Sequence, residues 1–263
     1  MIIVKLGGSL LTSKNNEFSL RRDVLRRVAR ELKEGIDGSA IIVHGGGSFG
    51  HPLAEKYSLH EGFKSRNQIE GFVLTRLAMQ SFNSEVVASL VEVGLPAISL
   101  ATSSIFITEN KYINSYSRNI VEGFLRLGTF PVLYGDVVLD RAMGFCILSG
   151  DRIISKLTQE FKPDRIILAT DVDGIFTASP KLSSNAELIE EINPENYREI
   201  LSLLTPEKGD VTGGMLGKLE ELVSMANLGY ESIIVNALSE GRLKKVLLGE
   251  KVKGSVIRGG NYY

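Results

Sequence analysis

The sequence predicts an α/β protein with a doubly wound, mainly parallel sheet and helices on both of its faces. Short runs of β-branched residues alternate along the chain with longer segments whose apolar residues recur at helical spacing. Two early runs end in glycine clusters, which are typical of ligand-binding turns at a sheet edge. A length of 263 residues with 43% hydrophobic residues suits one domain over residues 1–263.

The charge balance excludes some classes of partner. The chain has 30 Lys and Arg residues and 31 Asp and Glu residues, so no global field favours nucleic acid or an anionic membrane. The N-terminus shows no secretory leader pattern, and no apolar run approaches the roughly 18 residues of a membrane span. We therefore expect a cytoplasmic protein. The single cysteine, Cys146, is interpreted as a small buried hydrophobic residue.

The first predicted element is a central strand over residues 2–6, which ends in Gly7-Gly8-Ser9. A glycine turn after a buried strand leaves backbone N–H groups free to bind a phosphate. Lys5 lies inside the apolar run, where a charge is costly unless it reaches solvent or faces an anion. Lys14 follows on a polar loop, and taken alone it is a surface lysine.

A helix is predicted through Glu34, with Ser19 as its N-cap and an arginine-rich face opposite the apolar one. No aromatic residues interleave with the arginines, so that face is interpreted as solvated. Residues 40–43 form the next strand and complete a right-handed parallel βαβ unit. The cluster Gly45-Gly46-Gly47 should therefore lie beside the first glycine turn at the carboxyl edge of the sheet.

The middle of the chain is predicted to contain one long helix and further strands. The helix covers residues 67–93, and its Phe72, Met79 and Phe82 either pack in the core or line an apolar pocket near the glycine clusters. The expected elements that follow are a strand over residues 96–100, an edge hairpin at residues 105–108, a polar loop over residues 110–118 and a strand over residues 131–134.

Two later strands, over residues 146–148 and 166–169, end in turns that contain acids. The first leads into Ser149-Gly150-Asp151, where Asp151 opens a helix and can serve as its N-cap. The second leads into Asp171 and Asp173. That turn lacks the spacing of an EF-hand calcium loop, and it fits recognition of the sugar or base of a nucleotide better.

The last part of the chain is predicted to supply another anion site. Residues 177–209 are polar and interrupted by prolines, so they are interpreted as a connection between lobes. A glycine-rich turn over residues 209–217 opens a helix that carries Lys218, an arrangement that favours an anion without matching the P-loop spacing. Residues 233–236 are predicted as an inner strand and residues 254–257 as a terminal edge strand.

Three glycine turns, three lysines and His51 thus map to one edge of the sheet, which favours phosphoryl transfer. A hydroxyl acceptor usually needs a carboxylate base, and the sequence around His51 offers none. A phosphate monoester needs no base because it is already anionic at neutral pH. His51 can then donate a hydrogen bond to such an acceptor, or it can merely cap the next helix. His44 is interpreted as a packed residue at a strand end.

Six segments resemble, in order, the motifs of the amino acid kinase superfamily, and most of all those of the archaeal-type isopentenyl phosphate kinases. The loop that ends in His51 is the most specific of them. Many relatives have an acidic residue directly before the lysine that corresponds to Lys14, whereas this sequence has Ser13. The segments are Lys5-Leu6-Gly7-Gly8-Ser9 with Lys14, His44-Gly45-Gly46-Gly47-Ser48-Phe49-Gly50-His51, Tyr134-Gly135-Asp136, Ser149-Gly150-Asp151, Thr170-Asp171-Val172-Asp173-Gly174-Ile175 and Asp210-Val211-Thr212-Gly213-Gly214.

The resemblance implies a three-layer sandwich with an acceptor-binding lobe over about residues 1–160 and a nucleotide-binding lobe over about residues 161–263. It implies a homodimer that transfers the γ-phosphoryl group of ATP, with Mg²⁺, to isopentenyl phosphate in isoprenoid biosynthesis. Lys14 would stabilise the transferring group, and Asp151 would hold Lys5 and Lys218. The implied ATP contacts are Lys5, Leu6, Gly7, Gly8, Ser9, Gly47, Asp171, Phe176, Gly214 and Lys218, and the implied acceptor contacts are Gly46, His51 and Gly150.

Two alternatives stay open. One is a kinase for another small anion, such as the phosphonate fosfomycin or an acyl carboxylate, although the apolar run over residues 72–86 favours an alkyl tail. The other is a nucleotide-binding sensor without turnover. The set of lysines disfavours the sensor, because a sensor has no transferring phosphoryl group to stabilise.

Overall fold

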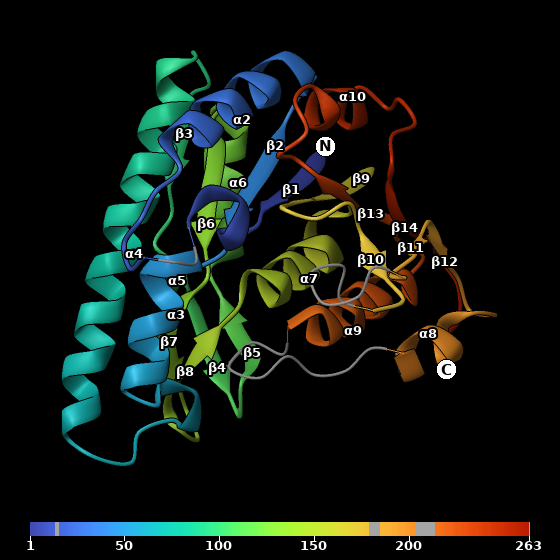
Figure 1. The fold of residues 1–263 in the computed structure, drawn as a ribbon. Helices are drawn as coiled ribbons and strands as arrows, with labels where there is room; N and C mark the ends of the chain where they lie inside the picture. Colours follow the sequence, from blue (N-terminus) through green and yellow to red (C-terminus); the bar gives the residue numbers. More distant parts are fainter. Residues whose placement is uncertain (14–15, 179–184, 204–213, 263) are drawn as a thin grey trace.

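The computed structural model describes residues 1–13, 16–178, 185–203 and 214–262 (Figure 1). Its main feature is an eight-stranded sheet in the order β12-β14-β13-β9-β1-β2-β6-β3, in which only the β13–β14 pair is antiparallel. The strands are β1 (Ile2–Leu6), β2 (Ala40–His44), β3 (Ala97–Ser99), β6 (Phe130–Tyr134), β9 (Arg165–Thr170), β12 (Glu191–Ile192), β13 (Ser232–Asn236) and β14 (Gly254–Ile257).

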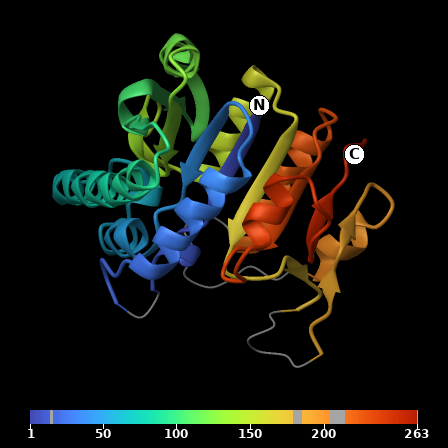
Figure 2. The same ribbon diagram turned by 90° about the horizontal axis from the view of Figure 1, so that it is seen from above.

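Helices cover both faces of this sheet, which confirms the predicted fold class (Figures 1 and 2). One face packs against α2 (Arg22–Gly35), α4 (Asn67–Glu92) and α10 (Arg242–Leu247). The other packs against α6 (Arg118–Arg126), α7 (Gly150–Phe161) and α9 (Gly214–Ala226). Because side chains alternate along a strand, Val4 faces the first layer, whereas Ile3 and Lys5 face the second.

The β1–α2–β2 unit is parallel, as predicted, and it places the two glycine turns at one edge of the sheet. The predicted start of its helix is wrong. The helix begins at Arg22 instead of directly after Ser19, because the segment before it pairs back with the first loop. Arg21 N–H donates to Leu11 O at 2.8 Å, and Thr12 and Leu20 form an antiparallel bridge.

A second sheet, in the order β5-β4-β7-β8, lies beyond the carboxyl edge of β6. The hairpin predicted near residues 105–108 is present, but the loop predicted over residues 110–118 is wrong, since β5 occupies most of it. The buried carboxylate of Asp140 accepts backbone N–H groups from both turns that flank it, including those of Lys111 and Met143. The strands are β4 (Phe106–Glu109), β5 (Tyr112–Tyr116), β7 (Asp136–Asp140) and β8 (Gly144–Leu148).

The segment after β9 contributes to the fold more than a connection would. β10 (Ile175–Phe176) pairs with β11 (Leu188–Ile189), and β12 joins the main sheet outside β14. The prediction of β14 as the edge strand is therefore wrong. The remaining helices are short: α1 (Gly8–Leu11), α3 (Gly47–Lys56), η1 (Leu59–Glu61), α5 (Thr102–Ile105) and α8 (Tyr197–Leu203).

Within the described ranges, no helix is long and apolar enough to cross a membrane, and this includes the 26-residue α4. Strands of the main sheet come from both sides of residue 160. The division into two lobes at that point stays a prediction.

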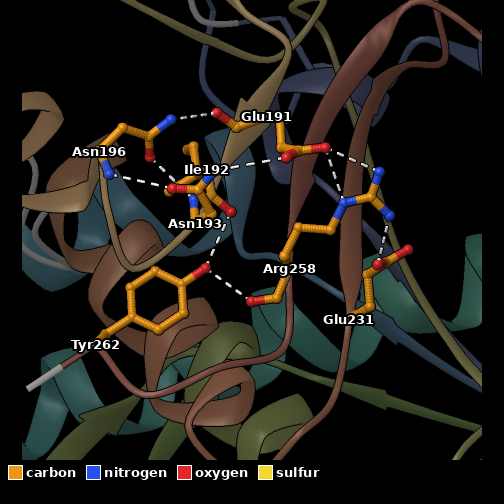
Figure 3. A network of polar contacts seen from close by, with 7 residues as sticks. All are labelled: Glu191, Ile192, Asn193, Asn196, Glu231, Arg258 and Tyr262. Carbon is orange, nitrogen blue, oxygen red and sulfur yellow. Dashed lines mark hydrogen bonds and ion pairs between the residues drawn. The ribbon is translucent and has the colours of Figure 1, made fainter.

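The C-terminal segment is tied to β12 through Tyr262 (Figure 3). The buried Tyr262 hydroxyl lies 2.9 Å from Ile192 O and 2.7 Å from Arg258 O, and Tyr262 N–H donates to Asn227 Oδ1. Arg258 also bridges the carboxylates of Glu191 and Glu231. These contacts hold the short edge strand β12 against the rest of the sheet.

We expect Tyr262→Phe to lower the free energy of unfolding by about 1–2 kcal/mol, because the single hydroxyl hydrogen that the carbonyl groups of Ile192 and Arg258 share is lost. Urea unfolding followed by circular dichroism measures the change. Tyr112→Phe is the matched control, since that side chain is 74% exposed and its substitution should leave stability unchanged. Equal stability of Tyr262→Phe and the wild type would show that the hydroxyl contributes nothing to the tail's docking.

Candidate active site

The two glycine turns interlock at the carboxyl edge of β1 and β2. A Cβ atom on Gly8 would lie 2.3 Å from Gly47 N, which no real Cβ approaches, so only glycine permits this contact. Gly47 also has a φ of +50°, a left-handed conformation that favours glycine. The turns lead into α1 and α3, which bring backbone N–H groups to one place, as an anion site requires.

Thr12 joins the two turns, and its role was missed by the sequence analysis. Its buried hydroxyl donates to Gly8 O at 2.8 Å and accepts the Ser48 N–H at 2.9 Å. A threonine that follows an apolar turn gives no distinctive signal in sequence, because its partner is 36 residues away.

Lys5, Asp151 and Lys218 meet beside these turns. Lys5 Nζ lies 2.5 Å from Asp151 Oδ2, and Lys218 Nζ lies 3.3 Å from Asp151 Oδ1. All three side chains are at most 15% exposed. Two ammonium groups on one carboxylate leave a net charge of about one positive unit in a largely dry place, which favours a bound phosphate.

The ionisation of this group follows from its burial. Burial lowers the pKa of Lys5 to about 8, against the opposing effect of Asp151 and with the help of Lys218. Burial alone would raise the pKa of Asp151, but the charges of Lys218 and Lys5 outweigh it and lower that pKa to about 2. Asp151 is therefore ionised at neutral pH. Of these two groups, Lys5 has the pKa closer to neutral pH.

We expect kcat/KM for ATP to fall as the pH rises through about 8, because free enzyme then loses the Lys5 charge. The corresponding decrease in kcat should occur at higher pH, since bound phosphates favour the protonated amine of Lys5. Steady-state kinetics across the alkaline range measure both. Lys5→Arg should remove the limb from kcat/KM, because arginine stays charged. A flat wild-type profile would contradict this assignment.

Ser149, and not Asp151, caps α7. The Ser149 side chain accepts the Arg152 N–H, which leaves Asp151 in the first turn free to pair with the lysines. The interpretation of Asp151 as an N-cap is therefore wrong. Gly150 lies against Lys5: a Cβ on it would stand 3.2 Å from Lys5 Cε and 3.5 Å from His44 O.

Two of the other residues expected at ATP, Ser9 and Asp171, contact each other at this edge. Ser9 Oγ donates to Asp171 Oδ1 at 2.6 Å, which links the first glycine turn to the turn after β9. The Leu6 side chain is fully buried, so only its backbone can face a ligand. Phe176 is half-buried in β10, and Gly214 is the first residue of α9. Lys14 lies outside the described residues.

Two of the residues expected at the acceptor, Gly46 and His51, lie against each other. The exposed His51 of α3 turns back over the second glycine cluster, so that a Cβ on Gly46 would stand 3.4 Å from His51 Cδ2. Met79 and Phe82 are buried and pack in the core, which is one of the two predicted alternatives for these residues. Phe72 is half-buried against Phe145. His44 is fully buried, as predicted for a packed strand end.

Comparison with known proteins identifies the family of this chain. The model of the amino acid kinase family matches residues 1–236. The chain is 39% identical over 266 residues to isopentenyl phosphate kinase of Methanothermobacter thermautotrophicus, covering 98% of this chain and 99% of the relative. It is 35% identical over 268 residues to the enzyme of that name from Methanocaldococcus jannaschii, covering 98% of each.

The fold leads to the same family. X-ray structures of isopentenyl phosphate kinase superpose with a TM-score of 0.86 at 37% identity, covering 98% of this chain and 100% of that one. The chain therefore belongs to the amino acid kinase family and, within it, to the isopentenyl phosphate kinases.

Proposed function

We propose that this protein transfers the γ-phosphoryl group of ATP to isopentenyl phosphate, giving isopentenyl diphosphate and ADP. The observation that supports it best is the Lys5–Asp151–Lys218 group beside two interlocked glycine turns. The relatives named isopentenyl phosphate kinase, which match almost the whole chain, support the choice of acceptor.

Catalysis would rest on positioning and on charge. Lys5 and Lys218 would neutralise the negative charge of the phosphates, and Asp151 would hold both ammonium groups in place. Backbone N–H groups of the turns at Gly8 and Gly47 would bind the phosphates of ATP. We assign stabilisation of the transferring group to Lys14.

The acceptor would need no general base, because an oxygen of its phosphate is already a nucleophile at neutral pH. His51, Gly46 and Gly150 would bind this phosphate and place it in line with ATP. Gly150 lies against Lys5, and Gly46 lies against His51, which supports an acceptor site next to the paired lysine.

We expect His51→Ala to lower kcat/KM for the acceptor about 100-fold, because the donor to the acceptor phosphate is lost. The Kd of ATP, measured by calorimetry, should stay within about twofold. His51→Gln, which keeps an N–H donor, should recover part of the loss. Weakened ATP binding together with unchanged acceptor kinetics would contradict the assignment of His51.

Mg²⁺ would enter with ATP and supply charge neutralisation to its phosphates. In the part of the chain that the structure describes, no group of three or more His, Cys, Asp or Glu side chains can hold a metal ion. Phosphate oxygens and water would provide most of its ligands, and Asp171, which accepts a hydrogen bond from Ser9 Oγ, is a carboxylate beside the first glycine turn.

We also propose a homodimer. The long helix α4 presents Ile69, Val73 and Leu77 to solvent at intervals of four residues, and each is 47–57% exposed. Side chains at this spacing form one apolar stripe, which a second copy can cover. Analytical ultracentrifugation tests the assembly.

The proposed function is tested by measuring ADP release with a panel of acceptors. We expect turnover with isopentenyl phosphate, and little or none with fosfomycin or N-acetylglutamate. Turnover of fosfomycin alone would favour the phosphonate kinase. Nucleotide binding without turnover of any acceptor would favour the sensor, and absence of turnover with every alkyl phosphate would remove the proposed function.

A further inference from the structure

His44, the last residue of β2, stands directly before the second glycine cluster and is fully buried. Its ring stacks on Tyr134, with centroids 5.4 Å apart and planes at 18°, and packs against the Phe82 ring at a steep angle of 64°, with centroids 4.6 Å apart. A polar ring in such apolar surroundings needs hydrogen-bond partners for both nitrogens.

Those partners allow one arrangement of protons. Nδ1 lies 3.0 Å from Gly45 O, and a carbonyl only accepts, so Nδ1 carries the proton. Burial lowers the pKa of His44 to about 4, so the ring is neutral and Nε2 accepts. The donor to Nε2 is the Asn83 amide at 3.0 Å.

Asn83 is itself oriented by a third element. The Ser99 hydroxyl of β3 donates to Asn83 Oδ1, which leaves the Asn83 amide group of α4 to face His44. A chain of hydrogen bonds therefore runs from Ser99 through Asn83 and His44 to Gly45 O. The other polar group of Gly45 is also held, since its N–H donates to Leu6 O at 3.0 Å.

We propose that His44 is a positioning residue for the acceptor: by holding Gly45 O, it aims the Gly46 N–H at the acceptor phosphate. In a planar trans peptide the C=O and the following N–H point in opposite directions, so fixing one fixes the other. The described chain has no cis peptide bond. Gly46 lies against His51, on the acceptor side of the site. The identity of the ligand rests on the proposed function, whereas the hydrogen bonds do not.

The kinetic test compares His44→Asn with His44→Leu. The amide nitrogen of asparagine can take the place of Nδ1 and donate to Gly45 O, whereas leucine cannot. We expect His44→Leu to raise the KM of the acceptor about tenfold, with a smaller change in the KM of ATP, and His44→Asn to stay within about threefold of the wild type. An unchanged acceptor KM in His44→Leu, or equal losses in both variants, would overturn the proposal.

A second measurement needs no substrate. Nitrogen-15 NMR distinguishes the tautomers of the three histidines, and the His44 signals are those lost in His44→Asn. We expect a neutral ring protonated at Nδ1 that does not titrate between about pH 5.5 and 8. A proton on Nε2, or titration in that range, would overturn the proposal.

The two measurements separate this inference from the proposed function. The kinetic comparison uses whichever acceptor of the panel the wild-type protein phosphorylates. If the wild-type protein does not phosphorylate isopentenyl phosphate but His44 is the Nδ1–H tautomer, the result counts against the proposed acceptor only. An Nε2–H tautomer in an active isopentenyl phosphate kinase would count against the role of His44 only.

Discussion

Asp151→Asn is expected to lower kcat about 10³-fold, because the shared carboxylate that places Lys5 and Lys218 is lost. The amide keeps the shape of the side chain but not its charge. In the free enzyme Lys5, which is almost fully buried, then has no counter-ion, so its pKa should fall further. In the ATP complex the bound phosphates favour its charge, and the loss of its position remains. Steady-state kinetics with saturating ATP and isopentenyl phosphate measure the loss.

The same substitution should lower the free energy of unfolding by about 3 kcal/mol at neutral pH, because one partner of a buried ion pair is removed. The contribution of Asp151 to the free energy of unfolding should decrease toward acid pH. The folded-state pKa of Asp151 lies below its unfolded value, so the wild-type contribution is present above about pH 4 and is lost as the pH falls toward 2. Asp151→Asn should remove this acid limb.

Asp164→Asn is the matched control for Asp151→Asn. Asp164 pairs with the N-terminal ammonium group, but its side chain is 77% exposed, so water replaces the ion pair when it is lost. We expect wild-type kcat and nearly wild-type stability for this variant. Wild-type kcat in Asp151→Asn as well would mean that the two lysines keep their positions and charges without the carboxylate.

Gly8→Ala is expected to lower kcat/KM for both substrates at least 100-fold and to destabilise the protein by about 3 kcal/mol. The added Cβ would stand 2.3 Å from Gly47 N and 2.6 Å from Gly47 Cα. Both atoms belong to the backbone, so the two turns must separate. The phosphate-binding N–H groups of each turn then lose their common geometry. Kinetics and urea unfolding measure the two effects.

Gly123→Ala is the matched control, because the added Cβ meets nothing within 4 Å in α6. Alanine is a better helix former than glycine, so this variant should gain up to about 1 kcal/mol and keep its activity. Near-normal activity in Gly8→Ala would show that contact between the turns is not needed for phosphate binding.

The sequence was sufficient to predict the inner strands of the main sheet and the long helix α4. Residues such as Ile3 and Ile41 belong to continuous apolar runs, which only a doubly covered sheet accommodates. The sequence was not sufficient for elements that depend on distant partners. The helix α3 contains two glycines and Pro52, so local propensity disfavours it, and β5 is a half-exposed strand held by pairing with β4.

In the candidate site, too, the features that depend on local sequence were predictable and those that depend on distant partners were not. Glycines after buried strands predicted where the site would be, because that chemistry is local. The pairing of Asp151 with Lys5 and Lys218 joins residues up to 146 apart in number and came only from the resemblance to a family. Asn83 carried a usable signal, since it is a polar residue on the buried side of α4 between Met79 and Val86.

Both outermost strands of the main sheet are very short: β12 has two residues and β3 has three. A strand of that length offers few unpaired backbone groups to a strand of another chain. Although the inner strands of the main sheet are strongly apolar, its two edges should therefore resist the addition of a strand from another chain.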